Sequence, residues 1–333
     1  MPIRHLQSEP DVYLIEVPID HAIVPATNCY VVKDDGDCAV IDTGSPCERG
    51  YQHLDAQLNE LGVERSRASF ILTHVHFDHA GLIDRIAPPQ ARLYVGRSEY
   101  NRTLRSNVDR VLNEMLLRLP QEGVSASEVD TFVTMYERST EFSTPAHNPL
   151  LVGEGDKITV GRYSLSVLDL PGHTSGHIGL YEPRSQTLFC GDHVLGLISP
   201  CIETPSGSND NLGDHLSSLE RVANLPVRLL AWGHGDPQPT CQQRVRWLID
   251  HHEKRCAEAT RIIEENPGRT GLEIITSLRW SVPFDSWDLI PPIQRSVIIA
   301  EGLAVLDHLV ARGTIERFVD GNTALYCENR TNK

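Results

Sequence analysis

The stretch ILTHVHFDHAGL, residues 71–82, places three histidines and an aspartate within six positions, directly after an apolar run. The apolar run is β-branched and aromatic, which predicts a short strand. His74 and His76 lie two positions apart, and extended backbone directs such a pair to the same side. The residues that follow predict a short helix, with Asp78 as a candidate N-cap and His79 in the first turn. Imidazole and carboxylate groups gathered in this way are typical of a site for zinc or a similar divalent ion.

Three further segments repeat the design of a predicted strand that ends in a ligating residue. LDLPGHTSGHIGLY presents His173 after a Pro-Gly turn, TLFCGDHVLG presents Asp192, and RLLAWGHGDP presents His234 between two glycines. Glycines at such places allow positive φ and a close approach of backbone to a ligand. One Gly-His pair at a strand end is typical of an ordinary turn, but four such segments in one chain indicate a metal site.

The combined motifs resemble those of the metallo-β-lactamase-fold hydrolases. The five motifs of that family match here as AVIDTG around Asp42, THVHFDH, PGHTSGH, CGDHV and WGHG, over roughly residues 11 to 240. The resemblance implies an α/β fold, a four-layer αββα sandwich, with a centre of two divalent metal ions. Zinc is the expected metal, and iron or manganese uses similar ligands.

The resemblance also implies a set of metal ligands in two groups that share one carboxylate. The set comprises His74, His76 and His173 for one ion, Asp78, His79 and His234 for the other, and Asp192 as the bridge. Asp42 matches a buried aspartate that supports a ligand rather than binding metal. His177 and His193 match no ligand position, and we interpret them as pocket or packing histidines.

The charge of such a centre predicts hydrolysis. Two divalent ions carry four positive charges, two carboxylates offset two of them, and a bridging hydroxide leaves about one. A site of this kind lowers the pKa of bound water and stabilises the oxyanion of a tetrahedral intermediate. Asp78 is the expected catalytic residue, because its carboxylate is also able to orient the hydroxide. We expect a thioester or an ester, including lactones, to be cleaved, so that the partner is a small-molecule acyl substrate.

Other functions remain open at this stage. Some relatives with a winged-helix extension cut RNA, which gives a metal-dependent ribonuclease or phosphodiesterase as the first alternative. The second alternative is a persulfide dioxygenase-like oxidoreductase with one iron. Its site needs fewer ligands than the set found here, which disfavours it. A non-catalytic regulatory protein that has kept its metal site is the third alternative.

Composition limits the cellular setting and the partners. The chain has 333 residues and a formal net charge of -15, which disfavours general binding of polyanions such as nucleic acids. Its eight cysteines are scattered without a CxxC pair, as expected of free thiols in a reducing compartment. No apolar run is long enough for a membrane span, and the N-terminus does not read as a signal peptide. We therefore expect a cytoplasmic protein without membrane contact.

The remaining sequence predicts two additions to a catalytic domain over residues 1–240. Apolar residues at helical spacing predict a helical insertion over 97–148, which we interpret as a cap over the metal cleft, with Met115, Leu116, Phe132, Met135 and Tyr136 facing core or substrate. Residues 241–333 predict three helices and a hairpin, the order of a winged-helix module. That order resembles the extension found in the group of β-lactamase-like protein 2.

The predicted third helix of this module has two arginines and no lysine, which disfavours DNA binding. A wall for the substrate cleft or a homodimer contact is the expected role of the module. His251 and His252 lie in the middle of the first predicted helix. We expect them to face solvent, with a third metal as the alternative.

Overall fold

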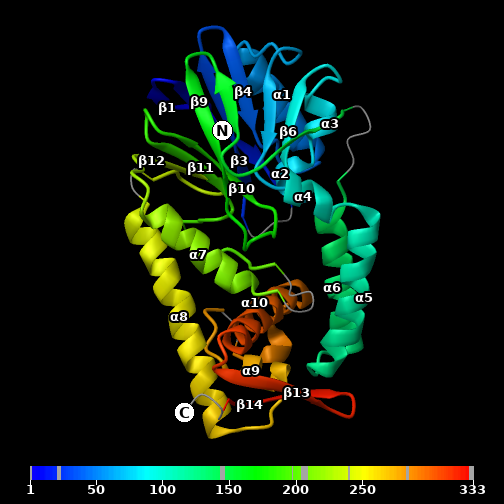
Figure 1. Cartoon of the computed structure of the whole chain (residues 1–333). Coiled ribbons are helices and arrows are strands. Elements are labelled where there is room, and N and C mark those ends of the chain that lie inside the picture. Colours follow the sequence, from blue (N-terminus) through cyan, green and yellow to red (C-terminus); the bar gives the residue numbers. More distant parts are fainter. Residues whose placement is uncertain are drawn as a thin grey trace.

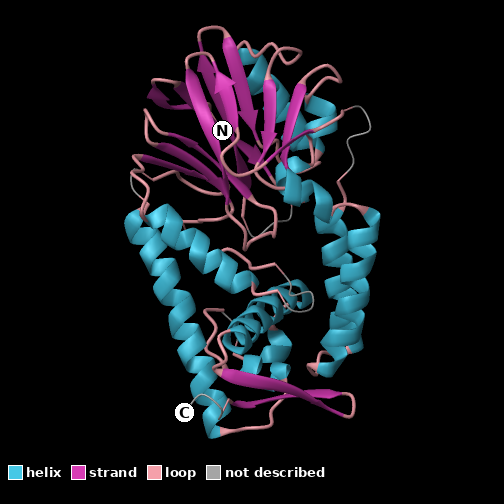
Figure 2. Ribbon diagram, in the orientation of Figure 1, coloured by secondary structure: helices cyan, strands magenta, loops and turns pink. Residues whose placement is uncertain are grey.

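The computed structural model describes residues 2–20, 24–142, 147–196, 198–203, 209–238, 241–282 and 285–329. Figure 1 shows two β-sheets that pack face to face in one half of the molecule, with helices and a two-stranded hairpin in the other half. Helices also cover the outer face of each sheet, so the predicted four-layer α/β sandwich is confirmed (Figure 2). Within the described ranges, no helix combines the length and the apolar character that crossing a bilayer requires.

The first sheet has the spatial order β1 to β7 among the described residues. Its strands are β1 (Arg4–Ser8), β2 (Asp11–Pro18), β3 (Ala26–Asp34), β4 (Asp37–Ile41), β5 (Ser69–Leu72), β6 (Arg92–Gly96) and β7 (Leu150–Val152). Strands β1 to β4 pair antiparallel, and β4 to β7 pair parallel. All four residues of β5 are buried, as expected of a parallel strand that is covered on both faces.

The second sheet has the order β12-β11-β10-β9-β8. Its strands are β8 (Lys157–Val160), β9 (Tyr163–Asp169), β10 (Ile178–Glu182), β11 (Thr187–Gly191) and β12 (Leu229–Trp232). Apolar side chains such as Ile71 and Phe189 fill the space between the two sheets. Because side chains alternate along a strand, Phe70 on β5 points the other way and packs in the layer of helix α1 (Glu48–Glu60).

Two helices cover the outer face of the second sheet. They are α7 (Asn211–Ala223) and the first part of α8 (Gln242–Glu265), and Leu219 and Leu248 bring them into one cluster with Leu188. The second part of α8 leaves the sheet and enters another apolar cluster, in the half of the molecule drawn below the sandwich in Figure 1. Helix α8 therefore links the two halves.

The insertion and the C-terminal segment share that second cluster. The insertion contains α4 (Arg97–Arg102), α5 (Arg105–Gln121) and α6 (Ala126–Thr140), and the C-terminal segment contains α9 (Gly271–Ser277), the 3-10 turn η1 (Trp287–Leu289), α10 (Pro292–Ala311), β13 (Ile315–Asp320) and β14 (Thr323–Glu328). Met115, Phe132 and Tyr136 of the insertion are buried in this cluster together with Tyr326 of β14. These three side chains therefore face core, whereas Leu116 is exposed.

The order helix, helix, helix, hairpin predicted for residues 241–333 is the order of α8, α9, α10 and the β13–β14 hairpin. The assignment of this segment to the winged-helix class, and the domain boundary at residue 240, stay predictions. All eight cysteines lie in described ranges and are free, as the sequence predicted.

Two local predictions are wrong. Helix α2 (Phe77–Ala80) begins after His76, so Asp78 is not the N-cap but projects from the first turn. A second short helix, α3 (Ile83–Ile86), follows it. His252 is fully buried rather than solvent-facing, because it lies on the same face of α8 as Leu248 and Cys256.

Candidate metal centre

The predicted ligands lie on loops that follow the strands and on the short helix α2. His74 and His76 follow β5, Asp78 and His79 belong to α2, and His173 follows β9. Asp192 follows β11, and His234 follows β12. The structure thus brings together all seven predicted ligands, from both sheets.

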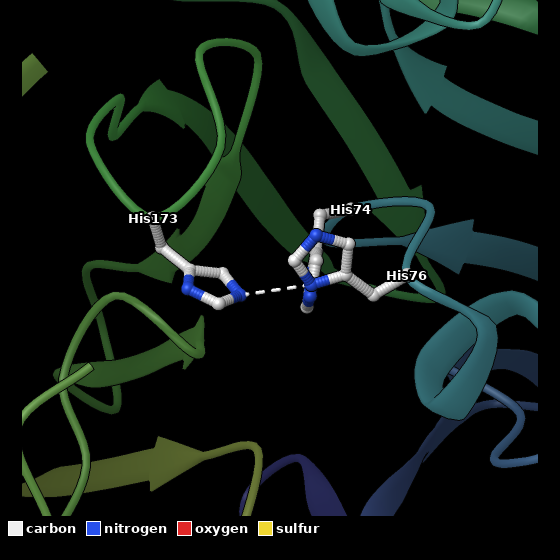
Figure 3. Close-up of side chains that lie close together, drawn as sticks. All are labelled: His74, His76 and His173. Carbon is white, nitrogen blue, oxygen red and sulfur yellow. Dashed lines mark hydrogen bonds between the residues drawn. The ribbon is translucent and has the colours of Figure 1, made fainter. Parts of the chain in front are cut away.

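The first group consists of His74, His76 and His173 (Figure 3). One nitrogen from each imidazole lies within 4.8 Å of the other two. His173 Nε2 lies 3.1 Å from His76 Nδ1. The ring centroid of His74 lies 4.6 Å from that of His76 and 4.9 Å from that of His173. Three imidazoles at this spacing are able to share one divalent ion.

The second group consists of Asp78, His79 and His234, whose ligating atoms also lie within 4.8 Å of one another. His234 Nε2 lies 3.3 Å from His79 Nε2 and 3.5 Å from Asp78 Oδ2. The side chain of Asp78 is 19% exposed, whereas that of His79 is fully buried. Asp78 therefore lies on the accessible side of this group.

Asp192 lies between the two groups. Its Oδ1 is 3.3 Å from His79 Nε2, and its Oδ2 is 3.3 Å from His234 Nε2 and 3.9 Å from His173 Nε2. His74 Nε2 is buried and has no hydrogen-bond partner among the described residues. Buried polar atoms are normally paired. A cation would supply the missing partner, so the residues present fit a metal pair.

Asp42 supports His79 from behind. Asp42 Oδ2 lies 2.8 Å from His79 Nδ1, and the aspartate also accepts hydrogen bonds from the backbone N–H and hydroxyl of Thr73, at 2.8 Å each. With Nδ1 donating to Asp42, the Nε2 lone pair of His79 points toward the centre. Asp42 adopts φ 58°, an uncommon conformation for a residue other than glycine, which is held by these bonds. The structure thus places Asp42 in contact with His79, and its role as the support of a metal ligand stays a prediction.

Two other histidines are oriented by backbone carbonyls that sequence reasoning missed. His234 Nδ1 donates to Ala26 O at 2.8 Å, and His173 Nδ1 donates to Cys201 O at 2.7 Å. Any residue type supplies a carbonyl, so no sequence signal marks these partners. Each bond fixes the tautomer that leaves Nε2 free to bind a cation.

Gly233 shows why the motif around His234 needs glycine. A Cβ at this position would clash with Asp192 Oδ1 and would lie 2.7 Å from His79 Cε1. The close approach of backbone to the centre, expected from the sequence, is therefore present here.

The histidines of the two groups differ in charge state. Burial, together with the neighbouring imidazoles, holds the pKa of His74 and His76 well below the ordinary value, so both are neutral. Burial also opposes charge on His234, but the carboxylates of Asp192 and Asp78 raise its pKa to about 10. Asp192 and Asp42 likewise raise the pKa of His79. Without an ion, the second group therefore holds protons.

A further cluster lies outside these groups. His251, His252 and Glu301 have ligating atoms within 4.8 Å of one another. Arg255 already lies there, with Nη1 4.0 Å from Glu301 Oε1 and Nη2 3.5 Å from His251 Nε2. A second buried cation beside this guanidinium is electrostatically unfavourable, so the cluster is better described as an ion-pair network.

His177 and His193 are both buried. His177 Nε2 accepts a hydrogen bond from the backbone N–H of Asp192 at 3.2 Å, so it contacts the ligand loop without entering either group. The ring of His193 lies 6.3 Å from that of His177.

Residues 22–234 match the model of the Metallo-beta-lactamase superfamily. The chain belongs to this superfamily. Among curated proteins, it is 26% identical over 323 residues to the probable metallo-hydrolase YqjP of Bacillus subtilis, covering 95% of this chain and 97% of the relative. It is 30% identical to the acyl-coenzyme A thioesterase MBLAC2 of Bos taurus, over 60% of this chain and 68% of the relative. A hydroxyacylglutathione hydrolase, GloC of Haemophilus influenzae, is 26% identical, over 64% of this chain and 89% of the relative.

Solved superfamily structures share the fold. The metallo-beta-lactamase family protein TTHA1429 of Thermus thermophilus superposes with a TM-score of 0.76 at 25% identity, covering 95% of this chain and 98% of that one. A beta-lactamase domain protein from Burkholderia ambifaria has the same TM-score at 20% identity, covering 98% and 94%. Because coverage is nearly complete, the likeness includes the insertion and the C-terminal segment.

Proposed function

We propose that this superfamily member is a binuclear metal-dependent hydrolase that cleaves an acyl thioester, ester or lactone. The observation that carries the proposal is the place of Asp192, whose two oxygens face histidines of both groups at 3.3 to 3.9 Å. A carboxylate in that place is suited to bridge two ions. The residues that would hold them are His74, His76, His173, Asp78, His79, His234 and Asp192.

Bound divalent ions would lower the pKa of a water molecule toward neutrality and polarise the carbonyl of an acyl substrate. The protein's own part is orientation. Without an ion, hydrogen bonding from His234 overcomes the cost of burial and lowers the pKa of Asp78 to about 2. A bound divalent ion would replace that proton as the positive neighbour, so the carboxylate of Asp78 would be ionised near neutral pH. An ionised acceptor on the accessible side of the centre would hold the attacking water by one of its protons and aim it at the carbonyl.

The choice of an acyl substrate is supported by the relatives. The names of two of them describe removal of an acyl group from coenzyme A or from glutathione, both of which are thiols. A thiolate leaves without strong acid help, so cleavage of a thioester would need no general acid besides the groups of the centre. Zinc is the proposed metal, because the site is rich in imidazole and contains carboxylate.

A side-by-side substrate assay tests this proposal. The zinc-loaded chain is offered acyl-coenzyme A thioesters, glutathione thioesters, lactones, phosphodiesters and RNA, with the chelator-treated chain as control. We expect turnover of at least one acyl class by the loaded chain and none after metal removal. Metal-dependent cleavage of RNA or a phosphodiester, with no acyl turnover, would show that the nuclease alternative is correct.

A further inference from the structure

Glu99 connects two of the histidine loops. It lies in the first turn of α4 and is fully buried. Its Oε1 accepts a hydrogen bond from the backbone N–H of Val75 at 2.9 Å, and its Oε2 accepts one from the hydroxyl of Thr174 at 2.7 Å. Val75 lies between His74 and His76, and Thr174 directly follows His173. One carboxylate thus holds the loops that carry all three histidines of the first group.

A second tie runs parallel to the first. Arg102, one turn farther along α4, donates to Glu203 Oε1 from Nη2 at 2.6 Å and from Nε at 3.0 Å. Glu203 Oε2 in turn accepts a hydrogen bond from the backbone N–H of Ser175 at 2.7 Å. The loop also lies directly against α4, since a Cβ on Gly176 would clash with the backbone of Glu99. Helix α4 therefore fixes the His173 loop through two carboxylates and through direct packing.

The burial of these charges has a cost that their contacts must offset. A fully buried carboxylate is expensive unless hydrogen bonds and an opposite charge compensate it. Glu99 receives the two bonds above and lies 3.4 Å from Arg102 Nη1. The loops that it joins follow β5 and β9, which belong to different sheets. The relative position of the two sheets sets the spacing between their histidines, and Glu99 contacts the loops of both sheets at this place.

We propose that Glu99 is a positioning residue of the first histidine group. By tying Val75 to Thr174, it sets the distance between the pair His74 and His76 on one side and His173 on the other, and so sets the affinity of this group for its ion. The inference rests on the proposed function in taking this group to bind metal. It adds that the first helix of the insertion belongs to the support of the centre.

The test compares Glu99→Ala, Glu99→Gln and Thr174→Val with the wild-type chain. Zinc affinity is measured by competition with a chelator, together with the electronic spectrum of the cobalt-loaded chain and the thermal midpoint of the metal-free chain. Glu137, exposed on α6, provides the control variant Glu137→Ala. The affinity readout does not depend on the substrate.

We expect Glu99→Ala to lower the affinity for one of the two bound ions by about 10- to 100-fold, the range typical for groups that orient metal ligands. The same substitution should change the spectrum of the cobalt-loaded chain. Glu99→Gln should stay within about threefold of wild type, because its amide is able to accept from Val75 and to donate to the Thr174 hydroxyl. Thr174→Val should lower the affinity for the same ion by about three- to tenfold, because it removes one of the two hydrogen bonds to Glu99.

Equal affinities for Glu99→Ala and the wild-type chain would overturn the proposal, as would an equal loss in Glu99→Ala and Glu99→Gln. If Glu99→Ala lowers the affinities for both ions equally and also lowers the thermal midpoint, the role of Glu99 is merely structural. If Glu99→Ala does not fold, Thr174→Val decides the question, with Thr174→Ser as its conservative partner. A wild-type chain that binds no zinc would instead refute the proposed function itself.

Discussion

Replacing Asp78 by alanine should lower kcat for acyl hydrolysis by about 10²- to 10⁴-fold, the contribution typical of a group that handles a proton in the transition state. Asp78 is the accessible carboxylate of the second group, and its Oδ2 lies 3.5 Å from His234 Nε2. The substitution removes a ligand candidate and the acceptor that would aim the attacking water. Because both effects concern the reaction more than substrate binding, KM should change less than kcat. Steady-state kinetics with parallel metal analysis measure this.

Asp84→Ala is the matched control. Asp84 lies in the first turn of the neighbouring helix α3, its side chain is 37% exposed, and it lies 3.5 Å from His147 rather than at the centre. We expect its kcat to stay within about twofold of wild type, as is usual for an exposed position. A kcat of the Asp78→Ala chain within about tenfold of wild type, with both ions still bound, would exclude the proposed role.

Glu122→Ala should lower the free energy of unfolding by about 3–5 kcal/mol, the usual result of removing one partner from a buried ion pair. Glu122 follows α5 of the insertion and is fully buried. It accepts hydrogen bonds from Arg317 Nε at 2.8 Å and from the hydroxyl of Tyr326 at 3.0 Å, both on the β13–β14 hairpin. Without the carboxylate, the buried hydroxyl of Tyr326 loses its partner, and the guanidinium of Arg317 keeps only its bond to Gln121 Oε1, at 3.1 Å. Chemical denaturation measures the effect.

Glu265→Ala is the comparison, because Glu265 forms an exposed pair with Arg261 on α8. Such surface pairs contribute about 0–1 kcal/mol. A loss of less than about 1 kcal/mol for Glu122→Ala would mean that the insertion is not anchored on the C-terminal segment as the contacts indicate.

The candidate ligands were predictable because each lies in a short motif at a strand end, where residue type and spacing carry the signal. Asp42 was predictable for the same reason. Glu99 was not, because its partners are a backbone N–H and a hydroxyl on loops far away in the sequence. Such contacts depend on how the sheets are placed, which no local pattern encodes.

The burial of His252 was missed for a related reason. Helix α8 packs its first part on the second sheet and its second part on the C-terminal segment, and His252 lies where the two apolar stretches meet. Two adjacent histidines on a long charged helix look like surface residues when neither packing partner is known. The same holds for the insertion, whose apolar stripe predicted a helix pair but not the surface that it covers.

Calorimetric titration of the metal-free chain with zinc, in two buffers of different ionisation enthalpy, tests the central claim of a two-ion centre most directly. We expect two ions per chain. We also expect protons to leave as zinc binds near neutral pH, because the raised pKa values of His79 and His234 mean that both hold protons that zinc must displace. The apparent affinity of the second group for its ion should rise with pH until the pH passes the pKa of His234, about 10. A stoichiometry of one ion per chain, or heats that do not depend on the buffer, would contradict the account.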